Sequence, residues 1–389
     1  MTVPSIALTR FHPDQTADPS RPLLVVGPSL GTAVRALWAP VAELLAGRFE
    51  VVGWDLPGHG DSPAATAGFD ASDLAAGVVA AVEPVLAGRG AFAWAGDSLG
   101  AVVGLQLSLD RPELLSSAAL MCTGAKIGTP ESWAERAATV REHGITAVLE
   151  GSRTRWFGPV FRAEHPDVVE AVLDGLRAVD AESYALACEA LGRFDVRDRL
   201  GTIEVPVLAV AGSEDGPTPP SSLREIADGV VDGRLVVLDG VGHLAPVEAP
   251  ADVAWLLGAH ADRTPTQREV AAAGMTVRRE VLGDAHVDRA TAAATGFTGE
   301  FQEFITRYAW GTIWTRPGLD RRSRSMITLT ALIARGHHEE LAMHVRAART
   351  NGLTVDEIKE LILQSAIYCG VPDANTAFRI ASQVLAEES

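Results

Sequence analysis

Cysteine is scarce in this chain, which has three in 389 residues: Cys122, Cys188 and Cys369. They lie far apart and form no CxxC pair, which argues against a disulfide framework and against a zinc site. No uninterrupted apolar run approaches the ~20 residues that a membrane-spanning helix needs. No charged segment followed by an apolar one opens the chain, as a signal peptide would. We therefore expect a soluble protein of the reducing cytoplasm, with no membrane partner.

Positive charge is also in short supply. Lysine and arginine number 33 against 50 aspartates and glutamates, which gives a formal net charge of −17. This balance argues against nucleic acid and anionic membrane surfaces as partners. An anionic small-molecule substrate would have to be bound by local arginines, because the overall field repels it.

Apolar residues are plentiful, at 47% of the chain, and 389 residues exceed an ordinary single domain. Residues 1–260 alternate short β-rich runs with helical stretches, which predicts an α/β fold with a mostly parallel sheet. Residues 125–200 lack strand patterns and are expected to form a helical lid over a sheet edge. The predicted strands are Pro22–Val26, Glu50–Trp54, Ala91–Ala95, Leu115–Met121, Val205–Val210 and Leu235–Leu238.

After residue 260 only helical periodicity is found. Residues 261–273 are polar and alanine-rich and are predicted to be a linker, and residues 274–389 an all-α domain. Thr354-Val355-Asp356-Glu357 fits a capping box, which marks the start of one helix. The predicted helices are Gly299–Trp314, Asp320–Arg335, Glu339–Thr350, Thr354–Tyr368 and Asp373–Ala386.

A single serine lies between two glycines in the GDSLG motif of residues 96–100, after an apolar strand and before a helical run. Glycines are needed there if the serine sits at a strained turn that exposes its hydroxyl. Such a serine requires a histidine as base and an acid that orients it, in the order Ser, Asp or Glu, His. Asp215 and His243 each follow a predicted strand in that order. We predict the triad Ser98–His243–Asp215, with Glu214 as the alternative acid.

The triad also needs donors for the oxyanion. We expect one amide from Leu99 and the other from Leu30, in the loop GPSLGT (residues 27–32), which this kind of fold places after its third strand. The alternative is that this loop is only a tight turn from strand to helix. His59 also follows a strand, but it precedes Ser98 in the chain, and we interpret it as structural.

The motifs PSLGT, WDLPGHGDSP, GDSLGA, SEDGPTPP and GVGHLAPVEAP resemble the α/β-hydrolase family and, within it, the 3-oxoadipate enol-lactonases. The segment Trp133–Phe161 is similar to the lid of those lactonases, including its Arg-Trp-Phe run. The resemblance covers residues 1–260 and implies hydrolysis of an enol-lactone. In the lid, Trp133, Arg155 and Trp156 are the candidates for binding the substrate.

Two groups of polar residues in the helical half are candidate site residues. Glu340 and His344 are four residues apart on one predicted helix and share a face. Arg321 and Arg324 share a face at a helix start, where cations oppose the helix dipole. The alternatives are a surface pair and a solvated basic turn.

Residues 274–387, from GMTVRREVLGDAHVDRA onwards, resemble 4-carboxymuconolactone decarboxylase. The wider family includes alkylhydroperoxidase-type enzymes with a CxxC pair, and here His337 and Glu340 stand at those positions, which excludes thiol chemistry. Relatives of this domain associate, so we expect a homo-oligomer. Loss of CO2 can place its electrons in a conjugated lactone carbonyl, so we expect no cofactor and no metal. For this step we assign His344 as proton donor, Glu340 as its orienting group, and Arg321 and Arg324 as carboxylate ligands.

The two resemblances are consecutive steps of protocatechuate breakdown through the 3-oxoadipate branch. The sequence therefore predicts a bifunctional hydrolase and cofactor-free carboxy-lyase acting on small carboxylate-bearing lactones. One alternative is an enol-lactonase whose helical domain serves only for assembly. The other is a general carboxylesterase or cofactor-free perhydrolase of the same fold.

Overall fold

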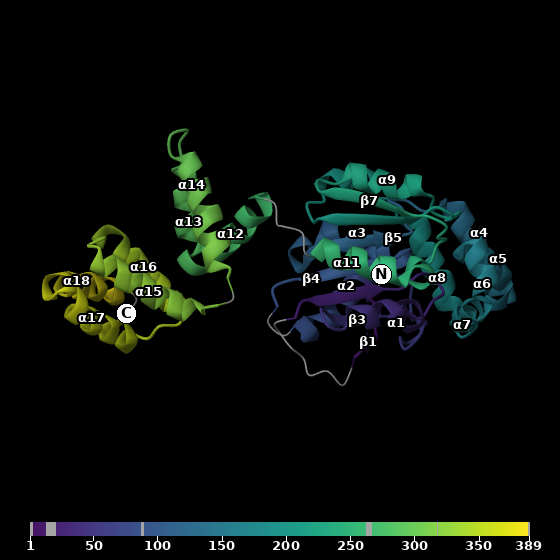
Figure 1. Cartoon of the computed structure of the whole chain (residues 1–389), viewed down its shortest axis with the longest axis horizontal. Coiled ribbons are helices and arrows are strands. Elements are labelled where there is room, and N and C mark those ends of the chain that lie inside the picture. Colours follow the sequence, from purple (N-terminus) through teal and green to yellow (C-terminus); the bar gives the residue numbers. More distant parts are fainter. Residues whose placement is uncertain (1–2, 13–20, 87–88, 262–266, 317, 388–389) are drawn as a thin grey trace. The chain divides into compact units, whose positions relative to one another are not determined.

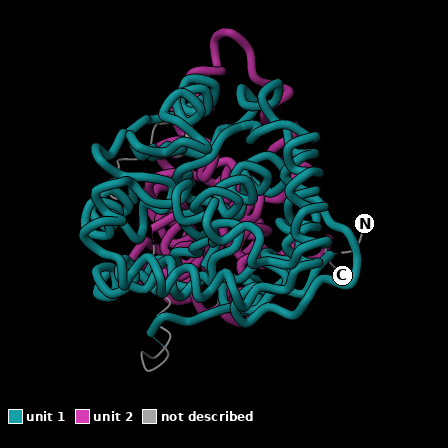
Figure 2. Tube along the Cα trace, turned by 90° about the vertical axis from the view of Figure 1, so that its right-hand side faces the viewer, with its two compact units in different colours: residues 1–263 teal, residues 264–389 magenta. Residues whose placement is uncertain are grey.

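The computed structural model describes residues 3–12, 21–86, 89–261, 267–316 and 318–387. The chain divides into two compact units, Met1–Arg263 and Thr264–Ser389, shown in different colours in Figure 2. The first unit combines a sheet with helices, and the second is helical (Figure 1). Across the described residues, no helix has both the length and the apolar character that crossing a membrane requires.

The N-terminal unit is built on a seven-stranded sheet of order β1-β3-β2-β4-β5-β6-β7. Every neighbouring pair is parallel except β1 and β3. Strands β2, β4 and β6 are buried along their whole length, as strands covered on both faces must be. The strands are β1 (Leu8–Arg10), β2 (Leu23–Gly27), β3 (Glu50–Trp54), β4 (Phe92–Asp97), β5 (Leu115–Met121), β6 (Val207–Gly212) and β7 (Gly233–Leu238).

Six of these strands are predicted by the sequence to within two residues at each end, and the α/β prediction is confirmed. Strand β1 is not predicted, because three residues are too short to show an alternating pattern. Helix α1 packs against α11, and α2 against α3. The helices outside the lid are α1 (Val34–Leu45), α2 (Ala71–Leu86), α3 (Leu99–Asp110), η1 (Pro112–Leu114), α9 (Pro220–Gly229), α10 (Ala245–Glu248) and α11 (Pro250–Ala261).

The lid predicted over residues 125–200 is helical, and it connects β5 to β6. Figure 1 shows its helices gathered at one end of the unit. Helix α4 begins with a capping box in which Thr129 and Ser132 exchange hydrogen bonds, and it packs along α8. The lid elements are α4 (Pro130–His143), η2 (Ile145–Val148), α5 (Leu149–Trp156), α6 (Pro159–Glu164), α7 (Pro166–Arg177), α8 (Ala181–Arg193) and η3 (Arg197–Thr202).

The C-terminal unit is entirely helical in its described residues, and the predicted capping box is present at Thr354 and Glu357. One buried cluster is formed by α15 to α18. A second joins Val281, Trp310 and Ala347 from three different helices. The elements are α12 (Gln267–Leu282), α13 (Asp284–Ala292), α14 (Gly299–Ile305), the π-helical segment η4 (Thr306–Trp314), α15 (Arg321–Ala334), α16 (His338–Thr350), α17 (Val355–Cys369) and α18 (Val371–Ala386).

The segment predicted as a linker, residues 261–273, runs into a helix earlier than its predicted end. Helix α12 begins at Gln267, so residues 267–273 are helical, and residues 262–266 lie outside the described ranges. The reason is a close approach of α12 to η4. A side chain at Gly274 would collide with the carbonyl of Thr306, and one at Gly311 with the carbonyl of Val270. The polar, alanine-rich composition of this segment does not reveal that contact.

Candidate active site

Ser98 is held at a strained turn between the end of β4 and the start of α3. Its φ of 52° lies in the left-handed region, which non-glycine residues rarely adopt. A side chain at Gly96 would collide with the carbonyl group of Gly100, and one at Gly100 would come within 2.5 Å of Gly27. The two glycines of the motif are therefore required by packing, and the serine side chain projects from the carboxyl end of the sheet.

The three predicted triad residues lie in hydrogen-bond contact. His243 Nε2 is 2.9 Å from Ser98 Oγ, and His243 Nδ1 is 2.9 and 3.0 Å from the two carboxylate oxygens of Asp215. All three side chains are buried. This is the arrangement in which an imidazole can take the serine proton while a carboxylate orients it.

The acid is fixed by a residue that sequence reasoning missed. Thr218 donates its hydroxyl to Asp215 at 2.7 Å and its amide at 3.0 Å. Its position three residues after the acid, in the turn DGPT, was the available signal for such a contact. Glu214, the alternative acid, is exposed and lines the outer cavity described below, so it is Asp215 that the structure pairs with His243.

The loop expected to complete the oxyanion site follows β2, the second strand of the chain, and not the third. It is fixed to the serine turn, since the amide of Gly100 donates to the carbonyl of Pro28 at 2.8 Å. Leu30 lines the same cavity as Ser98, and Leu99 is the first residue of α3. Donation from the Leu30 and Leu99 amides to an oxyanion stays a prediction.

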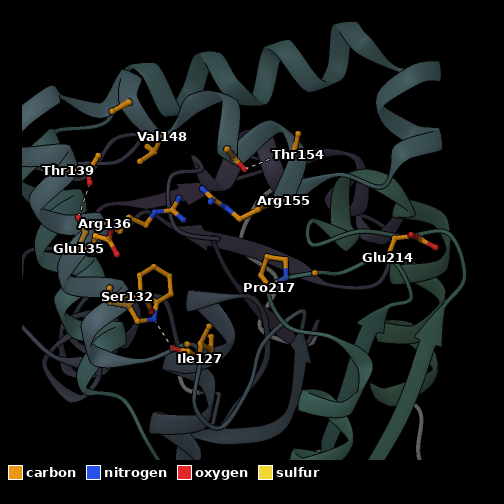
Figure 3. A pocket seen from close by; sticks show the side chains of 15 residues that line it. Ile127, Ser132, Glu135, Arg136, Thr139, Val148, Thr154, Arg155, Glu214 and Pro217 are labelled. Atoms are coloured by element: carbon orange, nitrogen blue, oxygen red, sulfur yellow. Dashed lines mark hydrogen bonds between the residues drawn. The ribbon is translucent and has the colours of Figure 1, made fainter.

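Two neighbouring cavities lead to the serine. The inner one, of about 70 Å³, is lined by Ser98, His243, Leu30 and Trp156 among others. The outer one, of about 670 Å³, lies under lid helices α4 and α5 (Figure 3). The residues common to both walls are Ile127, Trp133, Arg136, Arg155 and Pro217.

Arg136 is a second cation in this cavity, and the sequence reading missed it. Figure 3 shows its side chain and that of Arg155 pointing toward one another from α4 and α5. Arg136 Nε donates to the Tyr184 hydroxyl at 2.9 Å, and its guanidinium lies 5.8 Å from the Trp133 ring centre. Trp133 and Arg136 are three residues apart on one helix, and that spacing was a usable signal.

The two cavity arginines have no acidic partner in the part of the chain that the structure describes: neither Arg136 nor Arg155 forms an ion pair there. Burial lowers the pKa of Arg155, and the charge of Arg136 lowers it further. Two guanidinium groups facing one cavity make it suited to carboxylates.

A half-buried carboxyl, that of Glu248, connects the lid to the histidine loop. Glu248 accepts hydrogen bonds from the amides of Gly158, at 2.9 Å, and Gly242, at 3.1 Å. Burial raises its pKa to about 7. Asp97, beside the nucleophile, is fully buried with neither carboxyl oxygen hydrogen-bonded, and burial, then the charges of Asp215 and Glu248, raise its pKa well above the usual range.

His59 fits its structural interpretation. It is buried, its Nδ1 lies 2.9 Å from the carbonyl of Pro57, and its ring stacks on Tyr184 at 6.3 Å between centroids. Burial lowers its pKa to about 4. A neutral imidazole held in this way serves packing.

The helical unit places Glu340 and His344 together on α16. Burial lowers the pKa of the half-buried His344, while Glu340 raises it and His286 lowers it. Arg321 forms an ion pair with Glu280, and Arg324 donates to the carbonyls of Leu319 and Arg316 at 3.1 and 2.8 Å. These partners account for cations at the start of α15, and the contact of both arginines with a substrate stays a prediction.

Two family models match the chain. The one described as Alpha/beta hydrolase family matches residues 23–254, and the one described as Carboxymuconolactone decarboxylase family matches residues 299–383. The matches do not overlap, and each falls within one of the two compact units.

Individual proteins give the same division. The 3-oxoadipate enol-lactonase 2 of Acinetobacter baylyi is 33% identical over 230 residues, which are 59% of this chain and 85% of that protein. The 4-carboxymuconolactone decarboxylase of the same organism is 49% identical over 111 residues, which are 28% of this chain and 83% of that protein. The crystal structure of the enol-lactonase from Burkholderia xenovorans LB400 matches with a TM-score of 0.61 and 27% identity, covering 66% of this chain and 96% of that one.

Proposed function

Because the chain belongs to the alpha/beta hydrolase family through its first unit and to the carboxymuconolactone decarboxylase family through its second, we propose that it is a bifunctional enzyme. It decarboxylates 4-carboxymuconolactone to 3-oxoadipate enol-lactone and hydrolyses that lactone to 3-oxoadipate. The observation that carries the proposal is that one chain contains two segments, one similar to each of these enzymes. The product of the first reaction is the substrate of the second.

Hydrolysis uses the triad of the N-terminal unit. Ser98 Oγ attacks the lactone carbonyl carbon while His243 takes its proton, and the amides of Leu30 and Leu99 hold the oxyanion. The ring C–O bond then breaks, and the leaving enolate is protonated to a ketone. Water, deprotonated by His243, attacks the acyl ester and releases 3-oxoadipate. Asp215 keeps the imidazole oriented, through the contact seen at 2.9 Å.

The lid supplies the substrate contacts. Arg155 and Trp156, with Trp133, bind the acetate side chain and cover the ring, and Arg136 adds a second cation. These contacts favour a carboxylate-bearing lactone over a simple ester, because a neutral ester would leave two guanidinium groups without an anion. They are the reason to prefer a lactonase to a general esterase or perhydrolase.

Decarboxylation needs no external electron sink. The C–C bond to the departing carboxylate breaks, and its electron pair moves through the ring double bond into the lactone carbonyl, which becomes a dienolate. A proton delivered to the carbon beside that carbonyl then gives the enol-lactone. We assign the proton to His344 and the tuning of His344 to Glu340, which lies on the same helix.

Arg321 and Arg324 are the predicted carboxylate ligands of this step. Their present partners, Glu280 and two carbonyl groups, would have to be released on binding. A rise in KM for decarboxylation in Arg321→Gln or Arg324→Gln would support that role, and unchanged KM values would remove it.

We infer that the protein forms a homo-oligomer through its helical unit. Several of its large apolar side chains are exposed, Phe297 to 94%, and exposed apolar surface is typical of protein–protein contacts. Light scattering after gel filtration should give a mass above that of one chain. The other exposed apolar residues include Phe301, Phe304, Tyr308, Ile367, Tyr368 and Val371.

We place the enzyme in the cytoplasm. Cys122, Cys188 and Cys369 are all free thiols, as expected in a reducing compartment. Fractionation of cells that produce the protein tests this.

One assay tests both activities. Purified protein is mixed with 4-carboxymuconolactone, the absorbance is followed, and the products are identified by mass spectrometry. Formation of 3-oxoadipate supports the proposal. Accumulation of the enol-lactone would contradict the hydrolase half, and an unchanged substrate together with hydrolysis of added enol-lactone would favour a helical unit that serves only for assembly.

A further inference from the structure

One arginine in the helical unit is buried without an anion. Arg278, on α12, is 5% exposed, and its two terminal nitrogens donate to Thr306 Oγ1 and Gln302 Oε1, each at 2.9 Å. Its Nε is buried and has no hydrogen-bond partner. Both partners are neutral, so the positive charge is solvated by dipoles alone.

The adjacent arginine, Arg279, differs from Arg278 in having acidic partners. Arg279 forms ion pairs with Asp284 and Asp288 at the surface. Arg278 has no carboxylate within ion-pair distance anywhere in the described ranges of the chain. A buried charge without a counter-charge is costly to keep, which makes Arg278 a candidate for binding an anion.

One histidine, His286, lies close enough to this guanidinium to be affected by its charge. His286 stands on α13, and burial, followed by the charges of Arg278 and Arg289, lowers its pKa. His344 on α16 is in turn influenced by His286. The charge of Arg278 thus acts on His286, and that of His286 acts on His344, the assigned proton donor.

The helices that carry these residues pack against one another, α12 against both α13 and α16. Val281 of α12 and Ala347 of α16 meet in one buried cluster, and the two helices are in contact. Arg278 lies one turn before Val281, and His344 lies one turn before Ala347, on the same faces. Gly274 lies one turn before Arg278 on α12 and makes the close approach to η4, whose first residue is Thr306.

We propose that Arg278 binds the carboxylate that the lactone substrate keeps, and that Arg278, His286 and His344 line the decarboxylase site. The inference rests on the proposed decarboxylase activity and adds to it the group that holds the substrate. It places the carboxylate that the substrate keeps at the buried guanidinium of Arg278, in addition to the contacts predicted for Arg321 and Arg324.

The chemistry decides which carboxylate Arg278 binds. The departing carboxylate loses its charge as CO2, so an ion pair with it would stabilise the ground state more than the transition state. The acetate carboxylate keeps its charge throughout the reaction, and a fixed cation can hold it in the ground state and the transition state alike. Its binding therefore contributes to KM more than to kcat.

The test compares Arg278→Met, Arg278→Lys and the control Arg279→Gln in the full chain. In Arg278→Met we expect kcat/KM for decarboxylation to fall about 10- to 100-fold, chiefly through KM. Arg278→Lys should recover part of this loss, since the charge returns without the guanidinium geometry. Arg279→Gln should behave as the wild type, and enol-lactone hydrolysis should be unchanged in all three.

Two further measurements keep folding and function apart. Thermal unfolding of Arg278→Met should show no loss of stability, because an unpaired buried charge is replaced by an apolar chain of similar length. In NMR titrations the pKa of His286 should rise in Arg278→Met, because a neighbouring positive charge has been removed.

Several outcomes would overturn the inference. Unchanged kinetics in Arg278→Met would do so, as would a loss confined to kcat. A smaller assembly in Arg278→Met would show that the anion comes from a second copy of the chain. Failure of the wild-type protein to consume 4-carboxymuconolactone would instead refute the proposed function itself, which is a distinct result.

Discussion

The carbonyl oxygen of Trp156 accepts a hydrogen bond from the backbone amide of His243 at an N···O distance of 2.8 Å. The amide of Leu244 donates to the same oxygen at 3.2 Å. The last residue of lid helix α5 thus fixes the loop that carries the catalytic base, and Arg155 stands next to it. Lid position and base position are coupled through the backbone.

Disturbing this junction should impair hydrolysis. In Gly158→Ala, the new methyl group would lie 2.7 Å from the carbonyl oxygen of Gly240, which forces the lid end away from the histidine loop. We expect kcat for enol-lactone hydrolysis to fall about 10- to 100-fold, as small misplacements of catalytic groups do. Gly175→Ala is the control, because nothing lies within 4 Å of an added Cβ there. Equal kinetics in both variants would refute the coupling.

Ser98→Ala should separate the two activities. Without the nucleophile, hydrolysis should fall by about four orders of magnitude or more, while decarboxylation continues. A mixture supplied with 4-carboxymuconolactone should accumulate the enol-lactone, which mass spectrometry detects. Mass analysis of the intact wild-type protein during turnover should show an acyl adduct on Ser98. Full hydrolase activity in the variant would end the covalent mechanism.

Arg136→Met should weaken substrate binding by the lactonase. The guanidinium faces the inner cavity and is held by Tyr184 and Trp133, so its loss removes a positioned charge. KM for the enol-lactone should rise about 10-fold or more, with a smaller change for a neutral ester. Arg153→Gln, on α5 but paired with Glu170, is the matched control. A similar effect on the neutral ester would argue for a packing role.

Decarboxylation should be faster at low pH. The donor must be protonated, and burial lowers the pKa of His344 below 6.5 in spite of Glu340. The value of kcat/KM should therefore decrease as pH rises through that lowered pKa. Glu340→Gln removes the raising influence and should shift the midpoint to lower pH. An identical midpoint in Glu340→Gln would remove Glu340 from this role.

Glu248 should make the stability of the N-terminal unit depend on pH. Its pKa is raised from 4.5 to about 7 in the folded unit, so its contribution is full below pH 4.5 and is lost as pH rises through 7. Glu248→Gln should reduce the difference in unfolding free energy between pH 5 and pH 8 by roughly 2 kcal/mol. Urea unfolding followed by tryptophan fluorescence measures this, since six of the eight tryptophans lie in this unit. An undiminished difference would contradict the prediction.

The sequence predicted those parts of the site that depend on residue type and chain order. Ser98, Asp215 and His243 could be identified because serine chemistry demands these types, each placed just after a strand. The strands themselves were readable because buried parallel strands are continuous apolar runs. The lid could be predicted because residues 125–200 form a long interval without strand patterns between two predicted strands.

What escaped prediction depends on contacts between distant residues. Arg278 and Arg279 are neighbours of the same type, and only packing buries one and exposes the other. The partner of Arg321 is Glu280, 41 residues away, and no local pattern indicates it. Arg136 and Thr218 each lie three residues after a predicted site residue, Trp133 and Asp215 respectively. Their roles depend on the folded structure, in which Arg136 lines the cavity of Ser98 and Thr218 holds Asp215.

The two compact units are joined in one polypeptide. Translation of a single message therefore supplies both catalytic centres in a one-to-one ratio at every level of expression. Flux through the pair can be rebalanced only by changing a rate constant of one centre, because no promoter can produce one without the other.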